Sequence, residues 1–419
     1  MQQYDTYKDS GVKWLGEIPS HWEMLPGLAI FKENKEKNSN LAVNTVLSLS
    51  YGKIVVKKDI DEGLVPAEYN TYQIVHPGYI IIRCTDLQND KVSLRTGLVK
   101  DDGIITGAYL GLVTSGKYNS SYMHYFLHAW DITKEIYRHG NGLRQSLSWL
   151  DLRRLPILIP PIAEQTAIAS YLDTATAKID AAIAQQQKMI DLLDERKQII
   201  INRAVTKGLN PNAKMKDSGV EWIGEVPEGW EVRRIKYILR ESNVRSIDGH
   251  ESSYSLSKSK GLIPFTDKDN LTQARINNVG AKVVKPGEIV FNRFKARLFA
   301  VSNVEAAVSP DYAIYQKIAE CDLQYLVYLF STKLYRGELD RIAQGVGDGF
   351  SRLYTEDLFS IYAIFPNENE QRQIVGFIRK NTEKIDLAIS QCENQISLLQ
   401  ERKQIIINEV VTGKVKVTN

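Results

Sequence analysis

Apolar residues recur at alternating spacings of four and three along two long segments of the chain. This heptad periodicity predicts helices that bury one apolar seam against a partner helix. Neither segment, 163–206 or 371–412, contains a proline, so each is expected to form a continuous rod of roughly 60 Å. The seam positions are Ile179, Ile183, Gln186, Ile190, Leu193, Lys197 and Ile200 in the first segment, and Ile385, Ile389, Cys392, Ile396, Leu399, Lys403 and Ile406 in the second.

The two helical segments are copies of each other, offset by 206 residues. Residues 179–206 match 385–412 at 18 of 28 positions, and both copies contain ERKQIII. An apolar seam on a lone helix would be exposed to water, so we expect the two copies to bury each other. The linker between the first helix and the second domain is short, which predicts that the second helix runs antiparallel to the first. One globular domain is then expected at each end, related by a pseudo-two-fold axis.

A second repeated segment begins each half of the chain. Residues 9–23, DSGVKWLGEIPSHWE, return at 217–231 with ten of fifteen positions identical. Because glycine and proline punctuate the segment, we interpret it as an ordered arm rather than a helix. Its tryptophans, Trp14 and Trp22 in the first copy, are expected to pack on a core, with base or carbohydrate stacking as the alternative.

The stretches between the arms and the long helices predict two β-rich domains. A turn at 76–78 precedes a strand in the first domain, and its counterpart at 285–287 precedes a strand in the second. The framework therefore repeats, whereas the loops do not match, as expected where loops carry recognition. The predicted strands are 43–49, 73–75, 79–83 and 288–292, and the predicted amphipathic helices are 123–137 and 324–335.

Each domain ends in a similar exit segment, DLRRLPILIPP at 151–161 and DLFSIYAIFPN at 357–367. A Glu-Gln pair follows each segment, at 164–165 and 370–371. Proline and early acidic residues favour the start of a helix at both places.

Composition narrows the functional classes. The chain has 53 basic and 50 acidic residues in 419, so its bulk charge does not indicate a nucleic-acid binder. Three widely spaced cysteines without a CxxC pair argue against a zinc site or disulfides and favour a reducing, cytoplasmic location. We expect no signal peptide and no membrane span, because no apolar run reaches about 18 residues.

Catalytic motifs are absent from the sequence. It contains no NPPF/Y methyltransferase motif, no G-x-x-x-x-G-K-[ST] loop and no H-E-x-x-H. The charged residues of ERKQ occupy consecutive helical positions and point in different directions, so they cannot form one site. We interpret them as surface charges with one seam lysine, although docking of a partner subunit remains open.

Three motifs together resemble the specificity subunit of type I restriction–modification systems. They are W-x-G-E-[IV]-P-x-x-W at the start of each domain, the GNGLR segment at 140–144, and D-L followed by P-x-x-x-E-Q before an ERKQIIIN helix. The resemblance covers essentially the whole chain. It implies an α+β fold in which two similar β-rich target-recognition domains are separated by two long antiparallel coiled-coil helices.

The resemblance also implies the division of the chain and its role. Each domain would read one half of an asymmetric bipartite DNA sequence, and the helices would set the spacing between the halves. The chain would be noncatalytic and bind no cofactor, recruiting two methyltransferase subunits and restriction/translocase subunits that use S-adenosylmethionine, ATP and Mg²⁺. The expected parts are recognition domain 1 (1–161), spacer helix 1 (162–208), a linker (209–216), recognition domain 2 (217–366), spacer helix 2 (367–412) and a tail (413–419).

Basic and polar residues in the unmatched loops are the candidate DNA contacts. Arginine can pair with guanine, and lysine or serine can hold phosphates. A solvated charged surface is the competing interpretation for each loop, and a plain turn for the glycine-rich segments. The candidates are Ser50, Tyr51, Lys53, Lys57, Lys58, Arg83, Lys91, Arg95, Arg144 and Gln145 in the first domain, and Ser257, Lys258, Lys260, Arg293, Lys295, Arg297 and Arg352 in the second.

Two other functions remain open from the sequence alone. A stand-alone DNA methyltransferase or nuclease with a diverged active site is the main alternative. A coiled-coil scaffold that binds only proteins is the weaker one.

Overall fold

The computed structural model divides the chain into two compact units. The first comprises residues 1–187 and 393–419, and the second residues 188–392. Two long helices, α4 (Ile162–Lys207) and α8 (Glu368–Val411), contribute to both units. The structure describes residues 2–57, 69–87, 94–139, 146–257, 261–265, 278–294, 298–345 and 351–417.

The first unit is built on a four-stranded antiparallel sheet in the order β4-β11-β8-β9. Its central strand β8 is a run of three fully buried isoleucines, and successive side chains point to opposite faces of the sheet. Ile80 and Ile82 pack with helix α2, whereas Ile81 packs with the smaller strand pairs on the other face. The sheet strands are β4 (Phe31–Glu33), β8 (Ile80–Ile82), β9 (Thr96–Leu98) and β11 (Leu110–Thr114).

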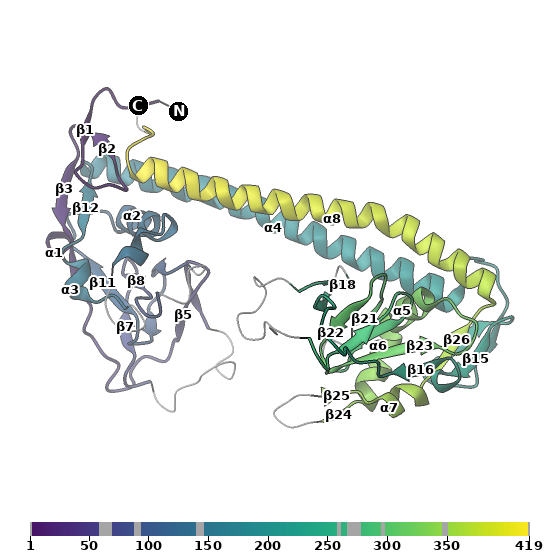
Figure 1. Cartoon of the computed structure of the whole chain (residues 1–419). Helices are drawn as coiled ribbons and strands as arrows, with labels where there is room; N and C mark the ends of the chain where they lie inside the picture. Colours follow the sequence, from purple (N-terminus) through teal and green to yellow (C-terminus); the bar gives the residue numbers. More distant parts are fainter. Residues whose placement is uncertain are drawn as a thin grey trace. The chain divides into compact units, whose positions relative to one another are not determined.

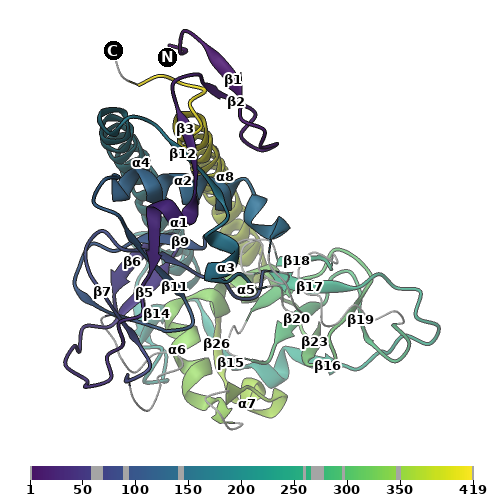
Figure 2. The ribbon, with the colours of Figure 1, turned by 90° about the vertical axis from the view of Figure 1, so that its left-hand side faces the viewer.

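Two-stranded pairs and short helices complete the first unit (Figure 2). Gln2 bridges to Lys416, so the two ends of the described chain lie together. The remaining elements are β1 (Tyr7–Asp9), β2 (Glu17–Pro19), β3 (Glu23–Pro26), α1 (Gly27–Ile30), β5 (Leu47–Ser50), β6 (Lys53–Val56), β7 (Gln73–Val75), β10 (Gly103–Ile105), α2 (Ser120–Ile132), η1 (Glu135–Arg138), α3 (Trp149–Leu152) and β12 (Pro156–Ile159).

The second unit has a sheet of the same order and sense, β16-β23-β20-β21. Ile289 and Phe291 of β20 face helix α5, and Val290 faces the opposite cluster, which repeats the alternation of β8. The elements are β13 (Met215–Asp217), β14 (Glu225–Pro227), β15 (Glu231–Arg234), η2 (Ile235–Tyr237), β16 (Leu239–Ser242), β17 (Tyr254–Ser257), β18 (Gly261–Pro264), β19 (Lys282–Val284), β20 (Ile289–Asn292), β21 (Phe299–Val301), β22 (Ala306–Val308), β23 (Tyr312–Lys317), α5 (Leu323–Ser331), α6 (Lys333–Ile342), β24 (Gln344–Gly345), β25 (Ser351–Arg352), α7 (Thr355–Ser360) and β26 (Tyr362–Phe365).

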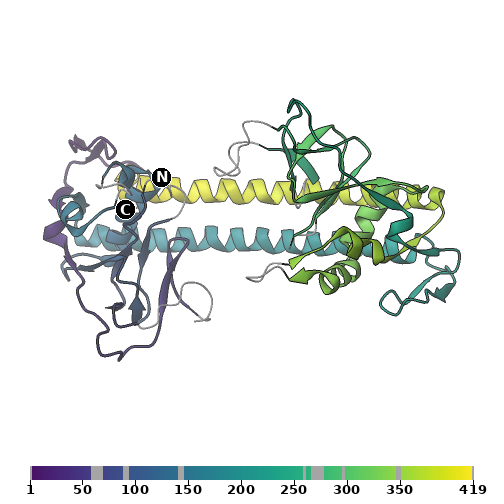
Figure 3. The same cartoon turned by 60° about the horizontal axis from the view of Figure 1, so that its bottom comes forward.

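Segments of α4 and α8 lie side by side in each unit (Figure 1, Figure 3). In the first unit, Ile168 and Leu172 of α4 share a core with Ile407 and Val410 of α8. In the second, residues 201–205 of α4 share a core with 374–378 of α8. The two helices are therefore antiparallel within each unit. Every predicted seam position is buried or half-buried.

The seam lysines find carboxylates on the facing helix. Lys403 Nζ lies 2.6 Å from Asp180 Oδ1 in the first unit, and Lys197 Nζ lies 2.5 Å from Asp386 Oδ1 in the second. Both pairs are offset by the repeat distance. Partial burial acts to raise the pKa of Asp180, but hydrogen bonds from Lys403 and Lys53 outweigh it and hold that pKa below its usual value.

Several predicted elements differ from the structure. The predicted helix 123–137 ends at Ile132, because Lys134 adopts a left-handed conformation (φ 64°) before the short η1 turn. The predicted helix 324–335 is broken at Thr332, whose extended backbone and hydroxyl cap the start of α6. The predicted strand 43–49 is ordered as a strand only from Leu47.

None of the helices in the described ranges combines the length and apolar character that a bilayer crossing requires.

Candidate nucleic-acid interface

The hairpin β5–β6 presents the first group of candidates. Tyr51 and Gly52 form its two-residue turn with positive φ values of 46° and 74°, as type I′ turns require. This turn exposes 92% of the Tyr51 side chain. Ser50 and Lys53 flank it, and Lys53 Nζ lies 2.8 Å from Asp180 Oδ2 on α4. The hairpin therefore carries an exposed aromatic tip and is tied to the helix beneath it.

Lys57 follows the same hairpin. Its backbone N–H donates to Val46 O at 2.9 Å, and the residue is half-buried. The structure thus brings Ser50, Tyr51, Lys53 and Lys57 onto one hairpin.

Arg95 does not reach the surface, which corrects its assignment as a DNA contact. Its side chain is fully buried, and its guanidinium donates to the carbonyl oxygens of Arg83, Thr85 and Asp86 at 2.8–3.2 Å. Nε donates to Tyr137 Oη at 3.1 Å. The hydrogen bonds of Arg95 therefore hold in place the segment that follows β8. Of the two candidates Arg83 and Arg95, the half-buried Arg83 keeps access to solvent.

Arg293 has a similar internal role in the second unit. Its side chain is 13% exposed, ion-paired with Glu241 and within 3.1 Å of Thr355 Oγ1. Thr355 Oγ1 also donates to Glu241. Arg293 thereby connects β20 to β16 and to the start of α7. Its burial makes a direct base contact through most of its guanidinium unfavourable, whereas its charge still contributes to the local potential.

Arg352 differs from these two arginines. It lies on β25, and its guanidinium carbon is 5.5 Å from the centroid of the Phe294 ring and 5.3 Å from that of Tyr354. Its Nε atom is buried and has no hydrogen-bond partner in the part of the chain that the structure describes. Ser257, at the end of β17, is half-buried.

Positive charge accumulates around Lys282, at the start of β19. Burial lowers the pKa of Lys282, and the neighbouring Arg293 lowers it further; Glu241 opposes this shift, while Arg245 and Arg352 add to it. We call these four cations and Glu241 the Lys282 cluster; within it, Lys282 Nζ and Arg293 Nη2 lie 3.8 and 2.5 Å from Glu241 Oε1. No pattern in the sequence pointed to Lys282, Arg245 or Glu241. Lys282, for example, precedes two valines, and this pattern predicts only a strand.

The equivalent position in the first unit is neutral. Gln73 Nε2 donates to Tyr109 O at 2.8 Å, and Lys282 Nζ donates to Tyr312 O at 2.7 Å. Both residues open a strand of the same two-stranded pair in their units. One backbone framework thus carries a neutral amide in one unit and an ammonium group in the other.

Eight predicted contacts lie outside the described residues. They are Lys58, Lys91, Arg144, Gln145, Lys258, Lys260, Lys295 and Arg297.

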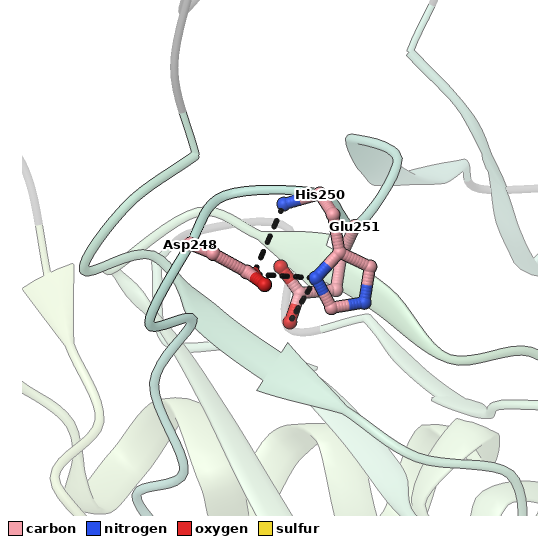
Figure 4. A group of neighbouring side chains, drawn as sticks. All are labelled: Asp248, His250 and Glu251. Carbon is pink, nitrogen blue, oxygen red and sulfur yellow. Dashed lines mark hydrogen bonds and ion pairs between the residues drawn. The ribbon is translucent and has the colours of Figure 1, made fainter.

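A small polar cluster occupies the turn before β17 (Figure 4). Asp248, His250 and Glu251 place their ligand atoms within 4.8 Å of one another. His250 Nδ1 lies 2.5 Å from Asp248 Oδ1, and Ser246 Oγ donates to Glu251. The hydrogen bond that His250 donates to the Asp248 carboxylate raises the pKa of His250. These contacts close the turn internally, which accounts for the cluster without an ion.

Comparisons with known proteins find similar sequences of one kind. No family model matches the chain. The MjaVIII specificity subunit of a type I restriction enzyme from Methanocaldococcus jannaschii is 25% identical, over 63% of this chain and 63% of that protein. The putative MjaX specificity subunit from the same organism is 24% identical, over 98% of both. This chain is therefore similar in sequence to specificity subunits of type I restriction enzymes.

The fold agrees with that relationship. A solved chain described as "Structural basis underlying complex assembly and conformational transition of the type I R-M system" has a TM-score of 0.62 and 14% identity, covering 95% of this chain and 99% of its own. The chain spans just under two thirds of the MjaVIII specificity subunit but nearly all of MjaX. The mixed helix-and-strand fold is therefore similar to the fold of that solved chain over 95% of this chain.

Proposed function

We propose that this chain is the DNA-sequence specificity subunit of a type I restriction–modification complex. The observation that carries the proposal is the alignment to a named specificity subunit over 98% of both chains. Because the alignment leaves no large region of either chain unmatched, it favours the same role rather than a shared module. A stand-alone methyltransferase or nuclease would need a catalytic domain, for which neither the sequence motifs nor the alignment provides support.

The two units would act as two target-recognition domains separated by the antiparallel α4–α8 pair. Each would read one half of a bipartite target, and the helices would fix the distance between the halves. Two similar modules on a rigid spacer suit half-sites about one duplex turn, roughly 34 Å, apart. The neutral Gln73 and the charged Lys282 support half-sites that differ in sequence, because equivalent backbone positions carry different chemistry.

The chain would be noncatalytic and would recruit two methyltransferase subunits and the restriction/translocase subunits. S-adenosylmethionine, ATP and Mg²⁺ would then be used on those partners. Exposed apolar residues on the helices support the recruitment: Leu192 and Ile199 on α4 are 51% and 60% exposed, and their repeat equivalents Leu398 and Ile405 on α8 are 59% and 47% exposed. Each pair is spaced by seven residues and so shares a face, which gives two equivalent docking stripes.

A binding assay with and without the methyltransferase subunits tests the proposal. The complex should protect two short DNA segments separated by an unprotected gap, and the footprint should require both kinds of subunit. Methyl transfer or cleavage by the purified chain alone would contradict a noncatalytic role.

A further inference from the structure

In the second unit, the guanidinium group of Arg352 lies against two aromatic rings and forms no ion pair with another described residue. We propose that Arg352 reads a pair of hydrogen-bond acceptors on the DNA half-site bound by this unit and determines part of its specificity. The inference deepens the proposed function and depends on it. Three observations carry it: the aromatic contacts of the side chain, the lack of a carboxylate partner among the described residues, and the contrast with the other described arginines of the same unit.

The aromatic contacts restrict the orientation of the guanidinium group. Phe294 and Tyr354 approach Arg352 from two different segments, with ring centroids 5.5 and 5.3 Å from the guanidinium carbon. Contacts of this kind are attractive through the ring quadrupole and favour stacking of the planar cation. The backbone of Arg352 is also fixed, because it pairs with Gln344 in the β24–β25 hairpin. Little side-chain freedom then remains to be lost on binding.

The charge of Arg352 has no carboxylate partner among the described residues. The carboxylate of Glu241, which like Arg352 acts on Lys282, is ion-paired with Arg293 and accepts a hydrogen bond from the hydroxyl of Thr355. Arg352 instead adds to the positive potential that lowers the pKa of Lys282. A cation kept in a cluster of like charges is unfavourable unless an anion or an acceptor-rich group binds there.

Other arginines of the unit show what a structural role looks like. Arg341 binds Glu338 through two hydrogen bonds of 2.7 Å, and Arg293 is held by Glu241 and Thr355. Arg352 has neither kind of bond in the described chain, although its Nε atom is buried. A planar, oriented fork of donors matches a bidentate acceptor, either O6 and N7 of guanine or two oxygens of a backbone phosphate.

The experiment uses the full chain assembled with its methyltransferase subunits, and measures binding to the bipartite target and to variants with one base changed at a time. If the acceptor is guanine, Arg352→Lys lowers affinity for the target by about 5- to 150-fold and abolishes discrimination at one position of one half-site. If it is a phosphate, Arg352→Ala weakens all sequences alike and reduces the salt-dependence slope by about 0.9. The first result supports the inference, whereas the second would overturn the role of Arg352 in specificity, because phosphate contacts carry no sequence information.

Matched variants separate recognition from folding. Arg341→Lys should leave DNA binding unchanged, since Arg341 is exposed and forms an ion pair with Glu338 at the surface. Phe294→Leu removes one ring without changing charge and should lose part of the Arg352 effect, whereas Phe294→Tyr should retain it. Wild-type affinity and discrimination in both Arg352→Lys and Arg352→Ala would overturn the inference. Failure of the wild-type complex to bind any bipartite sequence would instead overturn the proposed function.

Discussion

The indole Nε1 of Trp22 donates a hydrogen bond to Glu164 Oε2 at 3.0 Å, and Trp230 makes the equivalent bond to Glu370 Oε1 at 3.2 Å. The tryptophans close the repeated arms, and the glutamates begin the long helices. Two motifs that are about 140 residues apart in each half therefore form one joint. In both copies the following glutamine also donates to the proline carbonyl five residues before it, at 2.8 Å.

Removing the acceptor at this joint should destabilise the first unit more than the second. Glu164 also accepts from Tyr4 Oη at 3.1 Å and lies 2.7 Å from His21 Nε2. Glu164→Ala leaves the buried Trp22 indole unsatisfied, at a cost of about 1–3 kcal/mol. Urea unfolding followed by hydrogen exchange of each unit measures the change. A larger effect of Glu370→Ala would contradict this ranking.

Acid should destabilise the first unit selectively. Burial lowers the pKa of His124 to about 4 and that of His128 to about 3, so both are neutral when folded at pH 5. In the unfolded chain their pKa is about 6.5, so the unfolded state takes up protons first. Stability is fully present above pH 6.5 and falls as the pH drops toward 4. The loss for His124 alone is about 2 kcal/mol at pH 5.

The repeat offers a control for this acid effect. Tyr122 and Tyr325 make equivalent bonds to the exit strands, which places Val327 at the position of His124. His124→Val should therefore roughly halve the pH dependence between 7 and 5, because His128 still titrates in the unfolded chain. Protection of α2 and α5 from hydrogen exchange, corrected for intrinsic rates, gives the two units separately. Equal acid sensitivity of both helices would refute the assignment.

A charged residue in either docking stripe (Leu192 and Ile199 on α4, or Leu398 and Ile405 on α8) should impair assembly with the methyltransferase subunits without unfolding the chain. Leu398→Asp places a carboxylate at a position that is 59% exposed, so the free chain tolerates it. Buried against a partner, that carboxylate would be desolvated, and affinity should fall at least tenfold. Titration with the methyltransferase subunit by calorimetry measures the change, with Leu398→Met as the apolar control. Unchanged stoichiometry and affinity in the Leu192→Asp, Leu398→Asp double variant would exclude these stripes as the docking surface.

Neutralising the buried cation of the second unit should weaken binding to one half-site only. Lys282→Gln reproduces the group found at Gln73 and keeps a donor for the Tyr312 carbonyl. Loss of one charge from the cluster should reduce affinity roughly two- to fivefold, the range of ion interactions up to about 1 kcal/mol. Competition with targets altered in each half-site separates the effects. Loss of discrimination at both half-sites would contradict independent recognition.

The sequence was sufficient for the two long helices, but not for the bounds of the shorter helices or for the loops. The spacing of Ile179, Ile183 and Ile190 predicted the seam because periodicity depends only on which face is apolar. It could not distinguish Arg95, Arg293 and Arg352, which are the same residue type in similarly basic loops. The three side chains differ in whether a carbonyl or carboxylate oxygen of the described chain lies within hydrogen-bonding distance. Tertiary packing alone determines that difference. The breaks at Lys134 and Thr332 were missed for a related reason, since neither residue type prohibits a helix.

Sequencing the methylated bases in DNA treated with the reconstituted complex tests the central claim most directly. The account predicts one motif with two different half-sites and a gap of fixed length, and a longer gap with unchanged half-sites when one heptad is inserted into both α4 and α8. A single uninterrupted motif, or the same methylation pattern from the methyltransferase subunits without this chain, would contradict it.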